Sequence, residues 1–218
     1  MPRIELRTGT EAELIRPGEG RAERGLVIYP DIMGLRPLFD DHVSRLATQL
    51  GWPVCAVEMF PGQETLTLEE RLVAARDLDD EAKLADGLAA ADAVDAEEVC
   101  VLGFCMGGMY VFKFAPRFFR GVSFYGMIRV PENWRAPGQG EPLDALLPRR
   151  GENVLAIIGS ADIWTPSEDV DELRRTGATV VVYEGAEHGF VHDPDRPAHR
   201  PADATDAWRR VQQFLVAA

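Results

Sequence analysis

The sequence has only three cysteines, Cys55, Cys100 and Cys105, and they cannot all pair with one another. None of them belongs to a Cys-x-x-Cys motif, the spacing that favours structural zinc or dithiol redox chemistry. The chain is therefore not a small disulfide scaffold. At least one of the three thiols is expected to be free.

Long apolar stretches are also absent. No segment approaches the roughly 20 apolar residues that a membrane-spanning helix needs. The start, Met-Pro-Arg-Ile-Glu-Leu, has no apolar segment after its basic residue and so does not resemble an export signal. We therefore expect a cytoplasmic protein that does not associate with membranes.

Basic residues are outnumbered by acidic ones. Lys and Arg together number 23 and Asp and Glu 36, which gives a formal net charge of −13 at pH 7. A negative surplus repels phosphate backbones and anionic bilayers. Neither nucleic acid nor a membrane surface is therefore expected as a partner.

The length limits how many domains the chain can form. With 218 residues, of which 46% are hydrophobic, the chain predicts one domain over residues 1–218, because single cores stop growing at roughly 250 to 300 residues. That leaves no room for a large lid domain. A monomer or a small homo-oligomer is expected.

Short apolar runs alternate with amphipathic stretches. Residues 3–7 and 11–16 predict an N-terminal antiparallel hairpin around Thr8-Gly9-Thr10. Buried strands are predicted at 25–29, 53–57, 98–102, 121–125, 153–158 and 179–183. Helices are predicted at 39–50, 68–91, 106–115, 168–175 and 202–216, and residues 130–150, with four prolines, as a loop excursion. This alternation predicts an α/β fold with a mostly parallel sheet covered by helices on both faces.

One of these strands runs directly into Gly103-Phe104-Cys105-Met106-Gly107-Gly108. A nucleophile elbow has this form, because the tight turn between strand and helix needs tiny residues two before and two after the nucleophile. The elbow would also place the Cys105 sulfur at a helix N-terminus, which favours the thiolate. The same glycines are compatible with a plain strand-to-helix turn or a degraded nucleotide loop, so this motif alone leaves both interpretations open.

Two further motifs follow later strands. Asp162 comes after the run that ends at Gly159, and His188 comes after the run that ends at Tyr183. Nucleophile, acid and histidine in this chain order are typical of α/β-hydrolases, and sites gather at strand C-termini in open parallel sheets. Taken separately, Asp162 is compatible with a helix cap or a turn, and His188 with a hydrogen-bonded loop residue.

In these motifs the sequence resembles the dienelactone hydrolase family of α/β-hydrolases, from about residue 4 to residue 216. The resemblance implies that Cys105 is the nucleophile, His188 the general base and Asp162 its orienting acid. It rests on Tyr29-Pro-Asp-Ile-Met-Gly34, Gly103-Phe-Cys105-Met-Gly-Gly108, Gly159-Ser-Ala-Asp162-Ile-Trp-Thr-Pro166 and Gly185-Ala-Glu-His188-Gly-Phe190.

The segment after the first parallel strand supplies one backbone amide of the oxyanion hole in this fold. Ile32 is the expected donor here, and Met106, directly after the nucleophile, is the other. The resemblance also implies that an acidic residue at Asp31 contacts the thiol and keeps it protonated until substrate arrives. The best-known family members carry Glu where this chain has Asp31, and Pro30-Asp31 is equally compatible with a simple turn.

These residues predict hydrolysis of a small-molecule ester or lactone through a thioester on Cys105, with no cofactor. One alternative is a thioesterase or acyltransferase that uses the same triad. Another is a non-enzymatic binding or redox-sensing module in which Cys105 is an exposed thiol that is oxidised reversibly. In that case Asp162 would have no functional role.

The remaining candidates concern the substrate pocket. Trp164 and Phe190 flank the acid and the histidine, and Met33 and Tyr125 fall where the family lines its pocket. The family carries an arginine a few residues after the histidine to bind a substrate carboxylate, whereas this chain reads His188-Gly-Phe-Val-His192-Asp193. His192 is expected at the pocket mouth or on the surface. The arginines that could replace the missing one are Arg36, Arg71, Arg76 and Arg196.

The spacing of His188 and His192 is also compatible with a zinc site on a helix. Gly189 and Pro194 disfavour a helix there, so no metal is expected. Cys55 and Cys100 lie inside predicted strands and are expected to be core thiols. His42 and His199 are expected to be exposed.

Overall fold

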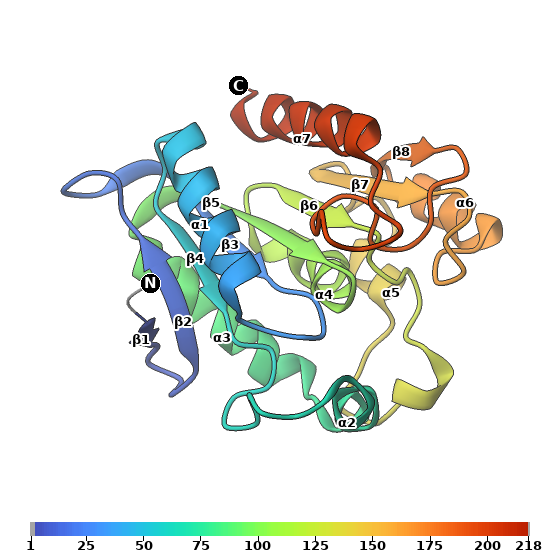
Figure 1. Ribbon diagram of the computed structural model, residues 1–218, viewed down its shortest axis with the longest axis horizontal. Coiled ribbons are helices and arrows are strands. Elements are labelled where there is room, and N and C mark those ends of the chain that lie inside the picture. Colours follow the sequence, from blue (N-terminus) through green and yellow to red (C-terminus); the bar gives the residue numbers. More distant parts are fainter. Residues whose placement is uncertain (1–2, 218) are drawn as a thin grey trace.

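The computed structural model describes residues 3–217, in which eight strands form one sheet in the order β1-β2-β4-β3-β5-β6-β7-β8 (Figure 1). β1 and β2 pair in antiparallel fashion, β2 is antiparallel to β4, and the remaining strands are mutually parallel. The predicted N-terminal hairpin and mostly parallel sheet are therefore confirmed. The strands are β1 Arg3–Glu5, β2 Glu11–Ile15, β3 Ala22–Tyr29, β4 Val54–Val57, β5 Ala96–Phe104, β6 Gly121–Phe124, β7 Val154–Gly159 and β8 Thr179–Tyr183.

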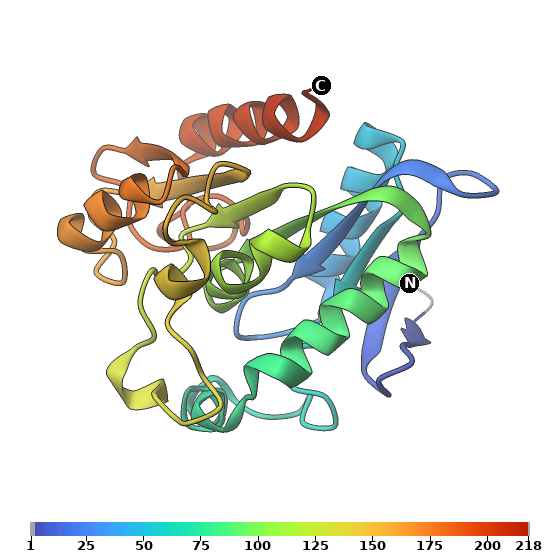
Figure 2. The same ribbon diagram turned by 180° about the vertical axis from the view of Figure 1, so that it is seen from behind.

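Helices cover both faces of this sheet (Figures 1 and 2). Those with at least one α-helical turn are α1 Pro37–Leu50, α2 Leu68–Ala74, α3 Asp80–Val94, α4 Met106–Phe114, α5 Pro142–Leu146, α6 Ser167–Arg175 and α7 Pro201–Val216. Apolar side chains of α1 and α7 pack on one face. Those of α3 and α4 pack on the other face, with α6 against α4 and β7. Burial on both faces explains why the central strands have continuous apolar sequences.

The prediction of a single helix over residues 68–91 is wrong. The structure has α2, a 3-10 turn at Ala75–Asp77, and then α3. The break arises because Asp79 is extended and its side chain accepts a hydrogen bond from the Ala82 amide at 2.9 Å, which starts a new helix. The excursion at 130–150 also contains two short helical segments, α5 and a 3-10 turn at Glu132–Trp134.

The parallel strands end at a common edge. In the register of the sheet Tyr29 lies opposite Gly103, Phe104 opposite Phe124, and Gly159 opposite Tyr183. The loops that follow β3, β5, β6, β7 and β8 therefore begin beside one another. These loops carry the candidate catalytic residues that were predicted from the sequence.

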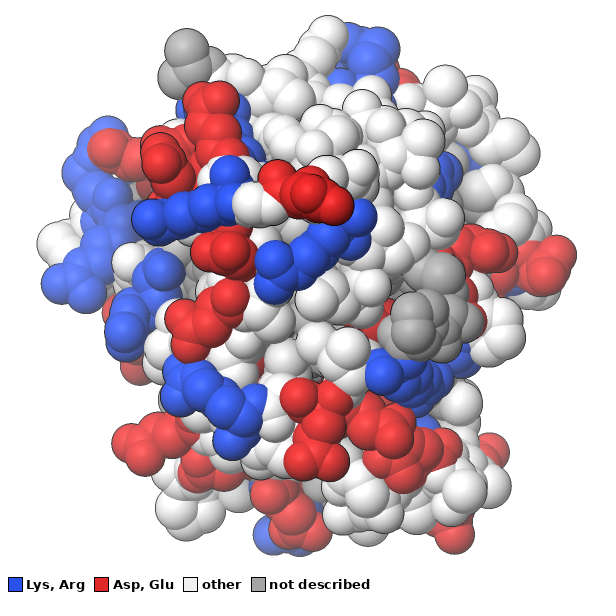
Figure 3. All heavy atoms as spheres, turned by 90° about the vertical axis from the view of Figure 1, so that its left-hand side faces the viewer, with Lys and Arg blue, Asp and Glu red and all other residues white. Residues whose placement is uncertain are grey.

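Charges are interspersed on the face that carries the N-terminal strands, shown in Figure 3. Ion pairs there include Arg3 with Glu11 at 3.1 Å and Arg7 with Asp92 at 3.0 Å. This face has no large patch of one sign, despite the net charge of −13. Within residues 3–217, no helix combines the length and apolar character needed to cross a membrane.

Candidate active site

The turn between β5 and α4 has the backbone of a nucleophile elbow. Cys105 has φ 55° and ψ −117°, a left-handed φ that non-glycine residues adopt rarely. A Cβ atom at Gly103 would lie 2.2 Å from the carbonyl oxygen of Gly107, and one at Gly107 would lie 2.1 Å from the carbonyl oxygen of Tyr29. Only glycine fits at these two positions, as the sequence predicted.

The elbow distinguishes Cys105 from the other two cysteines. Cys105 is partly exposed, whereas Cys55 and Cys100 are buried. Burial raises the pKa of Cys55 to about 12 and that of Cys100 to about 11. These two thiols are core residues, as expected, and Cys105 is the thiol that solvent and reagents can reach.

Asp162 and His188 meet although they follow different strands. The Nδ1 atom of His188 lies 2.8 Å from Oδ2 of Asp162, whose side chain is buried. The other carboxylate oxygen accepts a hydrogen bond from the Trp164 amide at 2.9 Å. The loops themselves are joined by the Ala161 amide, which donates to the carbonyl oxygen of Ala186 at 3.0 Å. The carboxylate therefore fixes the orientation of the imidazole.

The second nitrogen of His188 faces the elbow. Within residues 3–217, Nε2 is buried and has no hydrogen-bond partner. Burial disfavours the charged ring, but the nearby sulfur of Cys105 and the carboxylate of Asp162 outweigh it and raise the pKa of His188 to about 10. The raised pKa favours a protonated imidazole beside the sulfur of Cys105.

Two backbone amides near the elbow have no hydrogen-bond acceptor within the described part of the chain. One belongs to Met106, the first residue of α4, and the other to Ile32 in the loop after β3. This loop crosses the elbow closely, since a Cβ atom on Gly107 would approach the Pro30 carbonyl oxygen to 2.3 Å. The two amides remain the candidate donors of an oxyanion hole.

Asp31 has partners other than the thiol. Its carboxylate accepts hydrogen bonds from the Met33 amide at 2.9 Å, from Arg36 at 2.7 and 2.8 Å, and from Nε2 of His192 at 2.8 Å. No hydrogen bond to Cys105 is among those of residues 3–217. The gating contact that the resemblance implied is therefore not present, because the lone pairs of the carboxylate are used elsewhere.

Three of the six pocket candidates have almost no exposed surface. Phe190 and Tyr125 are completely buried, so they do not form the wall of an open pocket. His192 is also buried and is therefore not a surface residue, but it lies at the edge of a groove between α1 and α7. Phe190 packs between the rings of Tyr125 and Tyr183, with centroid distances of 5.8 and 5.3 Å. Trp164, at 42% exposure, remains accessible.

The other two candidates lie beside the oxyanion segment. Met33 is half-buried, and Arg36 is partly exposed and bound to Asp31. Of the further arginines considered, Arg71 is buried and donates to backbone carbonyls, and the guanidinium of Arg196 lies against Gly189.

Three buried polar residues lie behind the site, and their contacts were not predicted from the sequence. His42, expected to be exposed, is buried and donates from Nε2 to the carbonyl oxygen of His192 at 2.9 Å. Glu58, directly after β4, accepts hydrogen bonds from the Leu35 and Phe60 amides, each at 2.9 Å. Arg71 lies 3.7 Å from Glu58 and is also buried. Glu58 directly follows a buried strand, so its position in the sequence could have indicated that its carboxylate lies at the same edge of the sheet as the site.

The two histidines that could have shared a metal ion face different partners. His188 binds Asp162, and His192 binds Asp31. Across residues 3–217 no group of three or more His, Cys, Asp or Glu side chains has an arrangement suited to a metal ion.

An eight-stranded, mostly parallel sheet with an elbow at Cys105, followed in the chain by an acid and a histidine, defines an α/β-hydrolase. The chain belongs to the dienelactone hydrolase family, whose sequence profile matches residues 11–218. It is an enzyme of the ester and lactone hydrolase type.

Similar proteins agree with this assignment. A Synechocystis sp. protein provisionally named a carboxymethylenebutenolidase is 29% identical over 212 residues, which cover 87% of this chain and 84% of that protein. Carboxymethylenebutenolidase 2 of Cupriavidus pinatubonensis is 27% identical over 203 residues, covering 87% of this chain and 82% of the relative. A crystal structure from Klebsiella pneumoniae, provisionally named a dienelactone hydrolase, superimposes with a TM-score of 0.82 at 23% identity, covering 99% of this chain and 98% of the other.

Proposed function

We propose that this chain hydrolyses carboxylic esters or lactones through a covalent thioester on Cys105, with His188 as acid and base and Asp162 as the residue that orients His188. The observation that carries the proposal is the pairing of the elbow with an oriented imidazole. Cys105 has φ 55°, and His188 is held by Asp162 at 2.8 Å while its other nitrogen is buried without a partner.

The first half of the reaction is acylation of sulfur. The thiolate of Cys105 attacks the ester carbonyl carbon, and the carbonyl oxygen becomes an oxyanion that accepts hydrogen bonds from the amides of Ile32 and Met106. Each donor of this kind stabilises the transition state by about 3 kcal/mol. Collapse of the tetrahedral species breaks the bond to the alcohol oxygen, which takes its proton from the imidazolium of His188.

The second half is hydrolysis of the thioester. His188, now neutral, removes a proton from water as the water oxygen attacks the thioester carbonyl. The same two amides stabilise the second oxyanion, and its collapse expels the sulfur as thiolate and releases the carboxylic acid. The proton that His188 took from water stays on the ring, so the thiolate and imidazolium pair is restored.

The experiment is a panel of lactones, aryl esters and thioesters tested with the wild type and with Cys105→Ala. We expect turnover of at least one lactone or activated ester by the wild type and none above background by Cys105→Ala, with unchanged circular dichroism. Undiminished turnover in the alanine variant would refute the proposal. Cys105→Ser is the less decisive variant, because a serine could still be activated by the same histidine.

A further inference from the structure

A second buried acid and histidine pair lies next to the proposed triad. Nε2 of His192 lies 2.8 Å from Oδ2 of Asp31, and the side chains are 0% and 5% exposed, respectively. Asp31 follows β3, in the loop that carries the Ile32 amide. His192 lies in the loop after β8, which also carries His188. The pair therefore joins the oxyanion segment to the loop of the catalytic base.

Every hydrogen bond of this pair is satisfied when His192 is neutral. Its Nε2 donates to Asp31, and its Nδ1 accepts from the hydroxyl of Tyr125. The backbone amide of His192 in turn donates to the same hydroxyl oxygen at 3.3 Å. Both ring nitrogens are thus used, and burial lowers the pKa of His192. With both ring nitrogens hydrogen-bonded inside the protein, neither is free to bind substrate or to take up its proton.

The peptide of Ile32 is fixed from both sides. Asp31 accepts from the Met33 amide at 2.9 Å and is itself held by His192 and Arg36. The guanidinium of Arg71 donates to the carbonyl oxygen of Ile32, in the same peptide as the Met33 amide, at 3.3 Å. On the other side of Ile32, the peptide that carries the Ile32 amide is held because the carbonyl oxygen of Asp31 accepts from the Gly34 amide at 3.0 Å. With both neighbouring groups held, the free amide of Ile32 has a defined direction, which an oxyanion donor requires.

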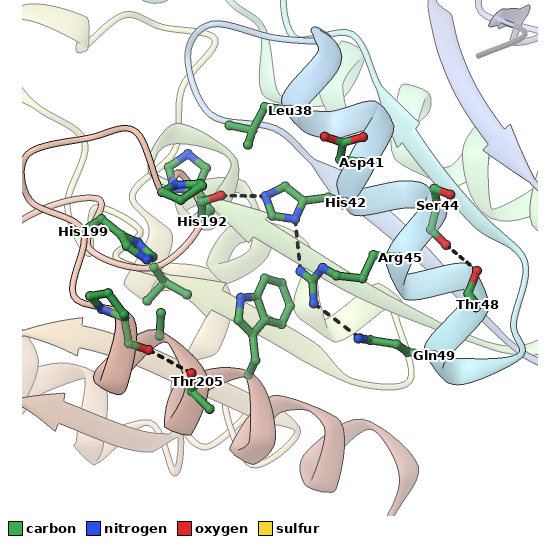
Figure 4. Close-up of a pocket in the computed structure, with 15 residues that line it drawn as sticks. Leu38, Asp41, His42, Ser44, Arg45, Thr48, Gln49, His192, His199 and Thr205 are labelled. Carbon is green, nitrogen blue, oxygen red and sulfur yellow. Dashed lines mark hydrogen bonds between the residues drawn. The ribbon is translucent and has the colours of Figure 1, made fainter.

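The other end of the pair is held as well. The rings of Tyr125 and His188 pack edge to face with centroids 5.2 Å apart, and Tyr125 has a left-handed φ of 39° directly after β6. Behind His192, in a groove of about 780 Å³ between α1 and α7, its carbonyl oxygen accepts from His42, and Arg45 donates to His42 at 3.1 Å (Figure 4). The backbone of the base loop is therefore anchored to α1.

We propose that His192 is a positioning residue for the reaction: together with Asp31 and Tyr125 it holds the Ile32 amide in place beside the elbow, and it does not itself bind substrate or transfer a proton. This inference rests on the proposed function. The resemblance to the family implied a substrate-binding arginine a few residues after the base, and here His192 stands in that segment and makes a buried internal contact.

The test compares two reactions of the same thiol. Ester hydrolysis develops an oxyanion and needs the Ile32 amide, whereas alkylation of Cys105 by iodoacetamide displaces iodide and develops none. His192→Phe preserves an aromatic ring and removes both ring hydrogen bonds. We expect kcat for an activated ester to fall about 10- to 100-fold, because a misplaced group near the reacting atoms costs about this much. The alkylation rate and the KM should stay within about threefold.

Two conservative variants and a matched control accompany this measurement. His192→Gln can keep the donor to Asp31 and should recover most of kcat. Tyr125→Phe removes one hydroxyl and should show the same pattern as His192→Phe with a smaller loss, so it decides the question if His192→Phe does not fold. His199→Gln changes a half-buried histidine outside the network and should leave both rates unchanged.

Three outcomes would overturn the positioning role. The first is an unchanged kcat for ester hydrolysis in His192→Phe. The second is an equal loss of the hydrolysis and alkylation rates in the folded His192→Phe variant. The third is a loss of kcat in His192→Gln as large as that in His192→Phe. The proposed function fails on a different result, namely turnover that survives in Cys105→Ala.

Discussion

Two acid and histidine pairs lie side by side in this enzyme, and they behave in opposite ways. His188 and Asp162 are 2.8 Å apart, and so are His192 and Asp31. The pKa of His188 is raised to about 10, whereas that of His192 is lowered. Equal distances between acid and base therefore do not define equal chemistry.

The surroundings of each pair explain the difference. The pKa of His188 is raised by the nearby sulfur of Cys105 and by Asp162, which together outweigh the cost of burial. His192 is more completely buried, and the charge of Asp31 is already balanced by Arg36, which also opposes a proton on His192. A histidine with an acid and a nucleophile can act as a base, whereas one with an acid and a competing cation remains a neutral link.

The largest expected effect comes from removing the nucleophile. Cys105→Ala should lower kcat/KM for an activated ester by about 10⁴-fold or more, as for nucleophiles of comparable triads. It should also lower the pKa of His188, because the sulfur is the main group that raises it. NMR titration of the two rings checks both halves of the comparison. A His188 pKa unchanged by the substitution would refute our account of the pair.

The next effect comes from the acid of the first pair. Asp162→Asn should lower kcat by roughly 10²- to 10⁴-fold, since the amide no longer stabilises the imidazolium and can select the wrong tautomer. Steady-state kinetics with the same ester measure it. If Cys105 were instead the thiol of a redox sensor, Asp162→Asn would leave thiol oxidation unchanged and there would be no hydrolysis to lose.

Varying the pH distinguishes the two histidines in the wild type, without any substitution. His188 has a higher pKa in the folded chain than its ordinary value of about 6.5. Its contribution to stability is therefore complete below about pH 6.5 and is lost as the pH rises through about 10. His192, with a lowered pKa, should show no protonation between pH 6.5 and 9. Imidazole proton or nitrogen shifts measure both, and a His192 that titrates in this interval would contradict its neutral role.

The smallest effect concerns the rim of the second pair. Arg36→Gln removes the bidentate partner of Asp31 but leaves the hydrogen bonds from His192 and the Met33 amide. Because Arg36 is partly exposed, we expect a loss of about 1 kcal/mol in the free energy of unfolding and a change of kcat within about threefold. Urea unfolding and steady-state kinetics measure the two. A loss of hydrolysis as large as in Asp162→Asn would place Arg36 in the reaction itself.

The first pair could be predicted from the sequence because each member is tied to a local pattern. Gly103 and Gly107 are required by contacts within one turn, so the elbow is visible in a short segment. Asp162 and His188 each follow an apolar run, and parallel strands bring such positions to one edge of the sheet. Their chain order then suggested how they meet.

The second pair could not be predicted in the same way. Asp31 and His192 are 161 residues apart, in loops without periodicity, and several partners were equally compatible with their positions. The burial of His42 could have been predicted, because His42 lies at helical spacing from Phe39 and Leu46 on the buried face of α1. Its hydrogen bond to the His192 carbonyl oxygen could not, since that partner is 150 residues away. The break between α2 and α3 was missed because apolar residues continue at helical spacing on both sides of Asp79. The chain nevertheless starts a new helix there, since the Asp79 side chain caps α3.

The central claim is that Cys105 carries the acyl group, and intact-protein mass spectrometry after rapid acid quenching tests it most directly. With an activated ester in excess, the wild type should gain the mass of one acyl group, located on the peptide that contains Cys105 and removable by hydroxylamine. Cys105→Ala should gain none. Rapid hydrolysis with no adduct on Cys105 at any quench time, or an adduct of the same size in the alanine variant, would contradict the account.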